Sequence, residues 1–239
     1  MHKLDIPAHA IERAMRRKGK RHAHDDVPAR QTALVVVDMQ NYFMAPGQQV
    51  EIPMAREIVP NVNRLAQALR EAGGRVIWIR TIAHAQAAAG WSHFHDTLNT
   101  PERNARRAAD LRDGAFGAAL WPGLDVRPDD LIVTKTRYSA LIPGSSNLEA
   151  VLRRDGITAV LIAGTATNIC CESTARDAML LNFRTTMVSD ANAAEHDSEH
   201  NATLATFCVT FGDVASCDEL IERFRREKAA VPQRAAAAS

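Results

Sequence analysis

The fold is decided by one unbroken apolar run, Ala33-Leu34-Val35-Val36-Val37, which ends in Asp38. A strand with one face in water would alternate apolar and polar residues, whereas a strand covered on both faces is apolar throughout. The run therefore predicts a strand that is buried on both faces of a parallel sheet.

Similar runs recur along the chain and alternate with helical segments. The further strands are predicted at 75–79 (RVIWI), 131–133 (LIV), 159–163 (AVLIA), 185–188 (TTMV) and 214–216. Helices are predicted over 55–72, 147–154, 168–181, 198–211 and 218–227. This alternation predicts an α/β fold, namely a three-layer α/β/α sandwich with a mostly parallel, six-stranded, Rossmann-like sheet.

The 239 residues divide into one domain and two flanking segments. Residues 31–227 are long enough for a single α/β domain with a sizeable core. Residues 1–30 form a basic N-terminal arm, expected to be solvated or to wrap a neighbouring subunit, and residues 228–239 form a low-complexity tail, expected to be disordered. Residues 84–120 have no strand pattern and predict a lid or an interface element.

The composition narrows the class of partner. The formal net charge is +1, so no overall field would recruit nucleic acid or an anionic membrane, and a small-molecule substrate is expected instead. No apolar run approaches the roughly 20 residues that span a bilayer, and the N-terminus lacks the apolar stretch of a secretory signal. Four cysteines, two of them adjacent, fit reduced thiols, so we expect a cytoplasmic protein.

Three chemically complementary residues follow three separate strands. They are Asp38, Lys135 and Cys170, and the ligand crevice of a parallel sheet lies beyond these strand ends. Cys170 is expected in the first turn of a helix, where backbone N–H groups and the nearby Lys135 would favour the thiolate. Each residue alone is compatible with a structural role, as a cap, a solvated charge or a small buried side chain. Together they indicate a thiol nucleophile with an acid–base group and a cation.

Three segments carry a resemblance to a known family. They are 164–178 (GTATNICCESTARDA), 37–41 (VDMQN) and 135–140 (KTRYSA). These segments resemble the isochorismatase-like cysteine hydrolases, and their sequences are most similar to those of the ureidoacrylate amidohydrolase branch. The match covers about residues 30–225. The resemblance implies a catalytic triad of Asp38, Lys135 and Cys170, a cis peptide bond at Thr165-Ala166, and a homo-oligomer, either a dimer or a tetramer.

The expected function is that of a cysteine-dependent amidohydrolase. It would cleave a C–N bond of a small amide, ureido or carbamoyl substrate through a thioester on Cys170, with the backbone N–H groups of Ala166 and Cys170 as the oxyanion hole. Asn41 and Tyr138 are candidate substrate contacts, and Arg137 could meet a substrate carboxylate. Each of these contacts could equally be a structural hydrogen bond.

No metal or other cofactor is expected. Nicotinamidases, which resemble this chain, hold a metal through an Asp and two His after the first strand, but residues 43–53 contain no histidine. The pairs His93/His95 and His196/His200 lack an evident third ligand, so we interpret them as exposed helix-face residues.

Three alternative functions stay open. The chain could be a non-catalytic small-molecule binding or regulatory protein on the same fold, or it could hydrolyse a different amide, such as biuret, maleamate or an N-carbamoyl amino acid. A thiol redox role of Cys170 with Cys171 is weaker, because adjacent side chains on a helix point about 100° apart. We therefore expect Cys171 to pack in the core.

Overall fold

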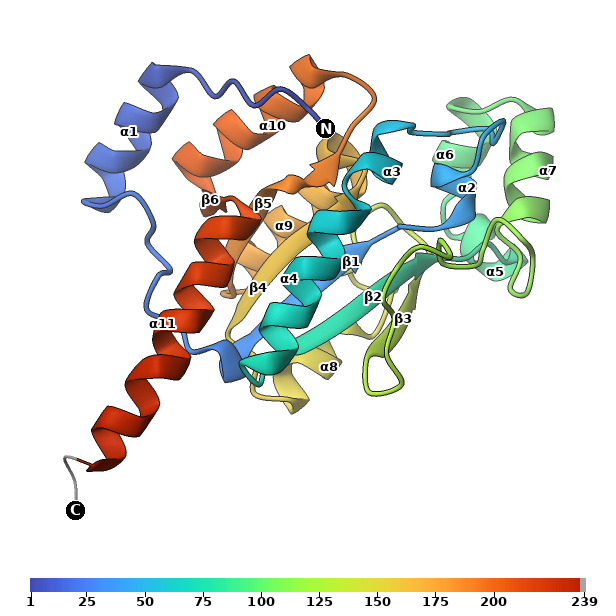
Figure 1. Cartoon of the computed structure of the whole chain (residues 1–239). Helices are drawn as coiled ribbons and strands as arrows, with labels where there is room; N and C mark the ends of the chain where they lie inside the picture. Colours follow the sequence, from blue (N-terminus) through green and yellow to red (C-terminus); the bar gives the residue numbers. More distant parts are fainter. Residues whose placement is uncertain (237–239) are drawn as a thin grey trace.

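A six-stranded, all-parallel sheet forms the centre of the protein in a computed structural model that describes residues 1–236 (Figure 1). The strand order is β3-β2-β1-β4-β5-β6. The strands are β1 (Thr32–Val37), β2 (Arg75–Thr81), β3 (Leu131–Lys135), β4 (Ala159–Thr165), β5 (Arg184–Ala193) and β6 (Asp213–Ala215). All six predicted strands are present, and the predicted three-layer fold is confirmed.

Helices cover both faces of this sheet. One face carries α3 (Met54–Glu57), α4 (Val59–Glu71) and α11 (Cys217–Ala236), and the other carries α8 (Leu148–Arg154), α9 (Glu172–Leu180) and α10 (Asp197–Thr210). Along β1, Leu34 and Val36 pack into the first layer, whereas Val35 and Val37 pack into the second. Both sets are fully buried, which explains why the run is apolar at every position.

The strand order reverses between β1 and β4. The chain builds β2 and β3 on one side of β1 and then returns to place β4, β5 and β6 on the other. Such a switch point separates the loops beyond two neighbouring strands and leaves room for a ligand. The loop after β1 and the loop after β4 therefore lie side by side at the carboxyl edge of the sheet.

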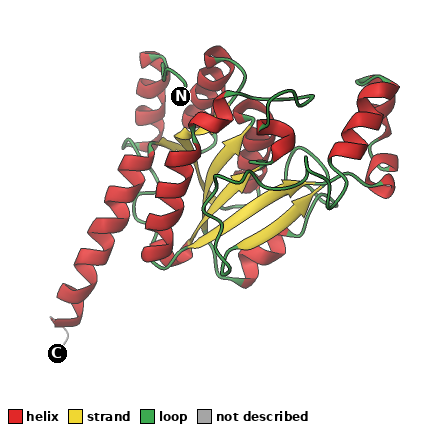
Figure 2. Cartoon of the chain, turned by 45° about the vertical axis from the view of Figure 1, so that its right-hand side comes forward, coloured by secondary structure: helices red, strands yellow, loops and turns green. Residues whose placement is uncertain are grey.

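The insertion between β2 and β3 contains three short helices. They are α5 (Ala85–Ala89), α6 (Ser92–Thr97) and α7 (Pro101–Asp110). Figure 1 places them beyond the carboxyl ends of β1, β2 and β3, close to α2 (Asn41–Met44), and Figure 2 shows helices of this insertion standing apart from the sandwich. We call these three helices the lid.

The N-terminal segment is not a solvated arm. Residues 8–18 form α1 (Ala8–Lys18), which packs against α10 (Figure 1), and a short 3-10 turn, η1 (Ala29–Gln31), leads into β1. Ala10 and Ala14, one helical turn apart, are buried in this contact, and Lys18 Nζ lies 2.8 Å from Asp213 Oδ1. The sequence analysis missed this contact because the buried face of the helix is a narrow stripe of alanines among many charged residues.

The C-terminal helix is longer than expected. We predicted a disordered tail over 228–239, but α11 continues to Ala236. This stretch is rich in alanine, which has the highest helix propensity of all residues. Residues 237–239 lie outside the described part of the chain. Within residues 1–236, the helices are all too short or too polar to cross a membrane.

Gly164, near the end of β4, is required by the packing of β4 against β1. Its φ is +116°, and a Cβ at this position would overlap the backbone oxygen and nitrogen of Val37. Gly164→Ala should therefore destabilise the protein by the cost of the positive φ, about 1–2 kcal/mol, plus about 1–3 kcal/mol for the clash. Urea unfolding measures this difference.

Gly114→Ala is the matched control for this prediction. Gly114 also has a positive φ, +82°, but no atom lies within 4 Å of the Cβ position. This variant should lose only the conformational part. Equal loss of stability in the two variants would show that the approach of β4 to β1 does not need a glycine.

Candidate functional site

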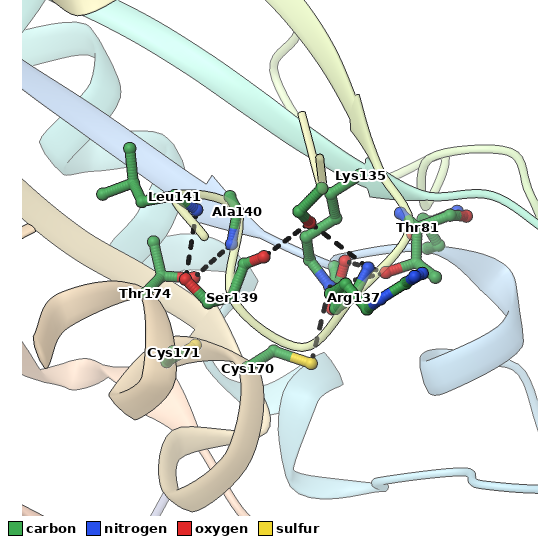
Figure 3. A network of polar contacts seen from close by, with 12 residues as sticks. Thr81, Lys135, Arg137, Ser139, Ala140, Leu141, Cys170, Cys171 and Thr174 are labelled. Carbon is green, nitrogen blue, oxygen red and sulfur yellow. Dashed lines mark hydrogen bonds and ion pairs between the residues drawn. The ribbon is translucent and has the colours of Figure 1, made fainter. Parts of the chain in front are cut away.

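Asp38, Lys135 and Cys170 meet in a buried cluster at the carboxyl edge of the sheet. Lys135 Nζ lies 2.8 Å from Asp38 Oδ2 and 3.6 Å from Cys170 Sγ, and Figure 3 shows the lysine reaching toward the sulfur. The exposed fractions of the three residues are 0%, 1% and 6%. A carboxylate, an ammonium group and a thiol therefore touch in a site almost free of water.

Thr81 completes the cluster. Its hydroxyl donates to Asp38 Oδ1 at 2.8 Å and accepts from Lys135 Nζ at 2.7 Å, and the carbonyl oxygen of Arg137 accepts from the same ammonium group at 2.9 Å (Figure 3). Our sequence analysis missed Thr81. It ends β2, so the strand-end rule that identified the other residues could have found it.

Strand register brings these side chains together. Thr81 pairs with Lys135 across β2 and β3, and Val37, directly before Asp38, pairs with Gly164 across β1 and β4. Asp38 has a φ of +54°, and its N–H donates to Ile79 O at 3.0 Å. The carboxylate leaves the strand at a sharp turn and points along the edge toward β3.

Burial and the neighbouring charges explain the pKa shifts of Lys135 and Cys170. Burial alone would lower the pKa of Lys135, but the neighbouring Asp38 carboxylate and the Cys170 sulfur outweigh it, so the pKa of Lys135 is raised. Burial raises the pKa of the Cys170 thiol to about 12; Lys135 opposes this shift and Asp38 reinforces it. Our expectation that this position favours a thiolate is wrong for the resting site. Lys135 lies closer to Asp38 than to the sulfur, and the carboxylate largely neutralises its charge.

Cys170 lies in a π-helical segment, η2 (Thr167–Cys171), instead of the first turn of an α-helix. The predicted cis peptide bond between Thr165 and Ala166 is confirmed. The N–H groups of Ile169 and Cys171 both donate to Ala166 O at 3.1 Å. Over residues 1–236, the N–H of Ala166 has no protein acceptor, so it is free to donate to a bound group.

The three candidate substrate contacts have different environments. Asn41 is buried, and its Nδ2 donates to Phe116 O at 2.9 Å, while Oδ1 has no hydrogen-bond partner in the described chain. Tyr138 is 40% exposed, and its pKa is raised by burial and then by the Cys170 charge.

Arg137 is used structurally. Its guanidinium donates to Ala87 O at 3.2 Å and to Gly90 O at 2.9 Å, and it stacks over the Trp91 ring at 5.1 Å. These contacts hold the end of α5 and the start of α6. The structure therefore favours the structural alternative over a contact between Arg137 and a substrate carboxylate.

The histidines divide into two kinds. His93 and His196 are exposed, as expected, and His196 caps α10, whereas His95 is partly buried and its Nδ1 lies 3.0 Å from Asn104 Oδ1. His200 is wholly buried, which corrects our expectation: its ring contacts Thr167 Oγ1 at 2.9 Å and Ser189 O at 3.0 Å, and burial lowers its pKa to about 4. Among residues 1–236, no group of three or more His, Cys, Asp or Glu side chains is arranged to hold a metal ion.

Cys171 packs in the core, as predicted. It is 0% exposed, and burial raises its pKa well above the ordinary value. Figure 3 shows its side chain directed away from that of Cys170. A buried, protonated thiol that points elsewhere is poorly placed to resolve an oxidised Cys170.

Curated proteins and solved structures resemble this chain over most of its length. The ureidoacrylate amidohydrolase RutB of Variovorax paradoxus is 32% identical over 214 residues, covering 82% of each protein. A probable inactive nicotinamidase of Arabidopsis thaliana is 33% identical over 177 residues, covering 73% of this chain and 87% of the relative. The crystal structure of a cysteine hydrolase from Pseudomonas syringae pv. phaseolicola has a TM-score of 0.71 and 26% identity, covering 84% of this chain and 95% of that one.

A comparison with protein families also gives a match over most of the chain. Residues 32–219 match the isochorismatase domain, and this range includes all six strands, the lid and the buried cluster. The arrangement of the sheet and the position of the cluster at its switch point agree with that match. The chain belongs to the isochorismatase family.

Proposed function

We propose that this protein is a cysteine-dependent amidohydrolase that cleaves a C–N bond of a small amide, ureido or carbamoyl substrate. The observation that carries the proposal is the position of Lys135, whose ammonium group contacts both the Asp38 carboxylate and the Cys170 sulfur in a buried site. Such a cluster can ionise a thiol during attack and return the proton to a leaving group.

In the first half of the reaction, Asp38 accepts the Cys170 proton while Sγ bonds to the substrate carbonyl carbon. The carbonyl oxygen becomes an oxyanion, which the N–H groups of Ala166 and Cys170 would receive. When the tetrahedral intermediate collapses, the C–N bond breaks and Asp38 gives its proton to the departing nitrogen. A thioester on Cys170 remains.

In the second half, water attacks the thioester and Asp38 accepts a proton from it. Collapse releases the acid product and restores the protonated thiol and the carboxylate. Lys135 keeps its proton throughout, in accord with its raised pKa, and its charge favours the anionic forms of both partners. The raised pKa of Cys170 fits a thiol that is protonated in the free enzyme near neutral pH and gives up its proton as it attacks.

The similarity to ureidoacrylate amidohydrolases supports a ureidoacrylate-like substrate. Biuret, maleamate and N-carbamoyl amino acids are the alternative substrates within the same reaction class. A non-catalytic binding protein is the main alternative from another class, and one relative is described as a probable inactive nicotinamidase. The complete cluster of Asp38, Lys135 and Cys170 argues against it here. A homo-oligomer stays a prediction.

The first prediction from the proposed function concerns the nucleophile. Wild type should release ammonia or amine from at least one member of a panel of ureidoacrylate, biuret, N-carbamoyl amino acids, maleamate and nicotinamide. Cys170→Ala should reduce the rate to background, because no thioester can form. A mass increase on the Cys170 peptide of rapidly quenched wild type would identify the intermediate.

Cys171→Ala is the matched control for the nucleophile. This neighbouring thiol is buried and points away from the cluster, so its removal should leave turnover within about twofold, as expected for a residue outside the reaction. No turnover of the whole panel by wild type would favour the binding protein. Loss of turnover in Cys171→Ala would revive the redox alternative.

The second prediction separates catalysis from stability in the ion pair. Asp38→Asn should lower kcat about 10²–10⁴-fold, because the base is lost, and should destabilise the fold by about 3–5 kcal/mol, because it leaves Lys135 unpaired. The double variant Asp38→Asn, Lys135→Met removes both charges and should recover part of that stability while staying inactive. Additive losses of stability would contradict a direct coupling between the two residues.

The third prediction concerns pH. With a pKa of about 12, the Cys170 thiol stays protonated in the free enzyme through neutral pH, so its alkylation by iodoacetamide should keep accelerating from pH 7 to pH 10. Peptide mapping measures the alkylation rate at Cys170, and the alkylation rate of free cysteine, with a pKa of about 8.5, should level off within this range. A plateau below pH 8 would show a resting thiolate.

Hydrolysis itself should follow a bell-shaped pH profile, since it needs a charged base and a protonated thiol.

A further inference from the structure

The turn that carries Cys170 has an unusual backbone. Over η2, the N–H of Cys171 donates to Ala166 O at 3.1 Å. The N–H of Glu172 donates to Thr167 O, so each of these two bonds joins residues five apart. A regular α-helix joins residues four apart, and π-helical turns are rare and frequently lie at functional sites. Contacts from a neighbouring element can stabilise such a turn.

Helix α10 contacts both ends of this turn. At the start, His200 Nδ1 lies 2.9 Å from Thr167 Oγ1. Directly after the end, Thr203 Oγ1 donates to Glu172 Oε2 at 2.9 Å. His200 and Thr203 are three residues apart, so they lie on one face of α10. One face of α10 therefore holds the two ends of the π-helical segment, with Cys170 between them.

The direction of the two His200 hydrogen bonds follows from their partners. Nε2 lies 3.0 Å from Ser189 O, and a carbonyl oxygen can only accept, so Nε2 carries the proton. Burial lowers the pKa of His200 to about 4, so the ring is neutral near neutral pH and Nδ1 is an acceptor. The Thr167 hydroxyl therefore donates to Nδ1. The His2 ring covers the His200 ring with centroids 4.4 Å apart, and His200 is 0% exposed, so water does not compete for this bond.

The direction of the Cys170 side chain depends on the conformation of this turn. Figure 3 shows the sulfur directed toward Lys135, and Sγ lies 3.6 Å from Lys135 Nζ. A turn that relaxed toward a regular α-helix would rotate Cys170 and change this distance. Misplacing a reacting group by 1 Å can cost about 10²-fold in rate. The bond from Thr167 to His200 opposes this relaxation, because it fixes the start of the turn relative to α10.

We propose that His200 is a positioning residue for the nucleophile, which holds the turn 167–171 so that the Cys170 sulfur faces Lys135. The inference rests on the proposed function, since it takes Cys170 as the nucleophile. His200 acts on Cys170 through Thr167 and the turn. Loss of the bond between His200 and Thr167 should therefore slow the chemical step and leave substrate binding nearly unchanged.

Two amide variants separate the two hydrogen bonds of His200. In His200→Asn, the side-chain oxygen can replace Nδ1 and keep the bond from Thr167. In His200→Gln, the side-chain nitrogen can replace Nε2 and keep the bond to Ser189 O. Both variants should be less stable in urea unfolding, because each gives up one buried hydrogen bond.

Only His200→Gln should lower kcat strongly. We expect a loss of about 10- to 100-fold with KM within about threefold of wild type, because the nucleophile moves and the groups that bind the substrate do not. His200→Asn should keep kcat within about threefold of wild type. Equal kcat values in the two variants would give His200 a purely structural role and would overturn the proposal.

Thr167 tests the same bond from the other side, and it decides the question if His200→Gln does not fold. Thr167→Val removes the hydroxyl and should lower kcat as His200→Gln does, whereas Thr167→Ser keeps the hydroxyl and should retain activity. The double variant Thr167→Val, His200→Gln should be no slower than the slower single variant, because both changes remove one interaction. Wild-type kcat in Thr167→Val, or multiplied losses in the double variant, would contradict the proposal.

Phe207→Leu is the matched control for the stability of α10. Phe207 lies two turns further along the same helix, is 0% exposed and stacks on Phe211. Shortening its side chain should destabilise the protein but leave kcat within about twofold of wild type. A loss of kcat as large as that in His200→Gln would show that the rate follows the stability of α10, and would overturn the proposal.

Alkylation of Cys170 separates this proposal from the proposed function, because it needs no substrate. Burial raises the pKa of Cys170 and Lys135 opposes this shift, so a sulfur that moves away from Lys135 forms less thiolate. With iodoacetamide at pH 9, Cys170 should react about tenfold more slowly in His200→Gln than in His200→Asn, the effect of losing one charge-assisted contact. This difference, measured by peptide mapping, would support the role of His200 even if wild type hydrolyses no compound of the panel. Equal rates, or a faster reaction in His200→Gln, would overturn it.

Discussion

The buried ion pair between Asp38 and Lys135 is the interaction on which the rest of the site depends. Both side chains are almost completely excluded from water, so their charges must be satisfied by each other and by nearby polar groups. The Thr81 hydroxyl and the Arg137 carbonyl oxygen supply those groups. Because these residues belong to the ends of β1, β2 and β3, the pair requires all three strands to be held in one register.

The same pair sets the chemistry of Cys170. A lysine alone beside a thiol would stabilise the thiolate, but here the carboxylate lies closer to the ammonium group and cancels much of its field. Burial then dominates, and the thiol is protonated at rest. A nucleophile that is activated only during attack is less exposed to oxidation and alkylation than a resting thiolate. The carboxylate that suppresses ionisation is also the group that accepts the proton in the proposed mechanism.

Segments far apart in the sequence support the turn that carries Cys170. His200 on α10 contacts Thr167 in the π-helical segment, and the His2 ring stacks on His200 with centroids 4.4 Å apart. His2, near the start of the chain, therefore contacts a residue that supports the turn carrying the proposed nucleophile. On the other side, the lid places aromatic and basic side chains beyond the strand ends. The proposed substrate site is thus bounded by elements outside the sheet.

The sequence by itself determined the six strands, the parallel sheet and three residues at its carboxyl edge, Asp38, Lys135 and Cys170. These follow from local rules, since an apolar run such as 33–37 can only be buried on both faces, and a residue that ends such a run can only lie at the edge. The tertiary structure alone decided the raised pKa of Cys170, the burial of His200, the docking of α1 and the structural contacts of Arg137. Each depends on distances between segments that are remote in the chain, because electrostatic and packing energies are set by which groups touch and how much water is excluded.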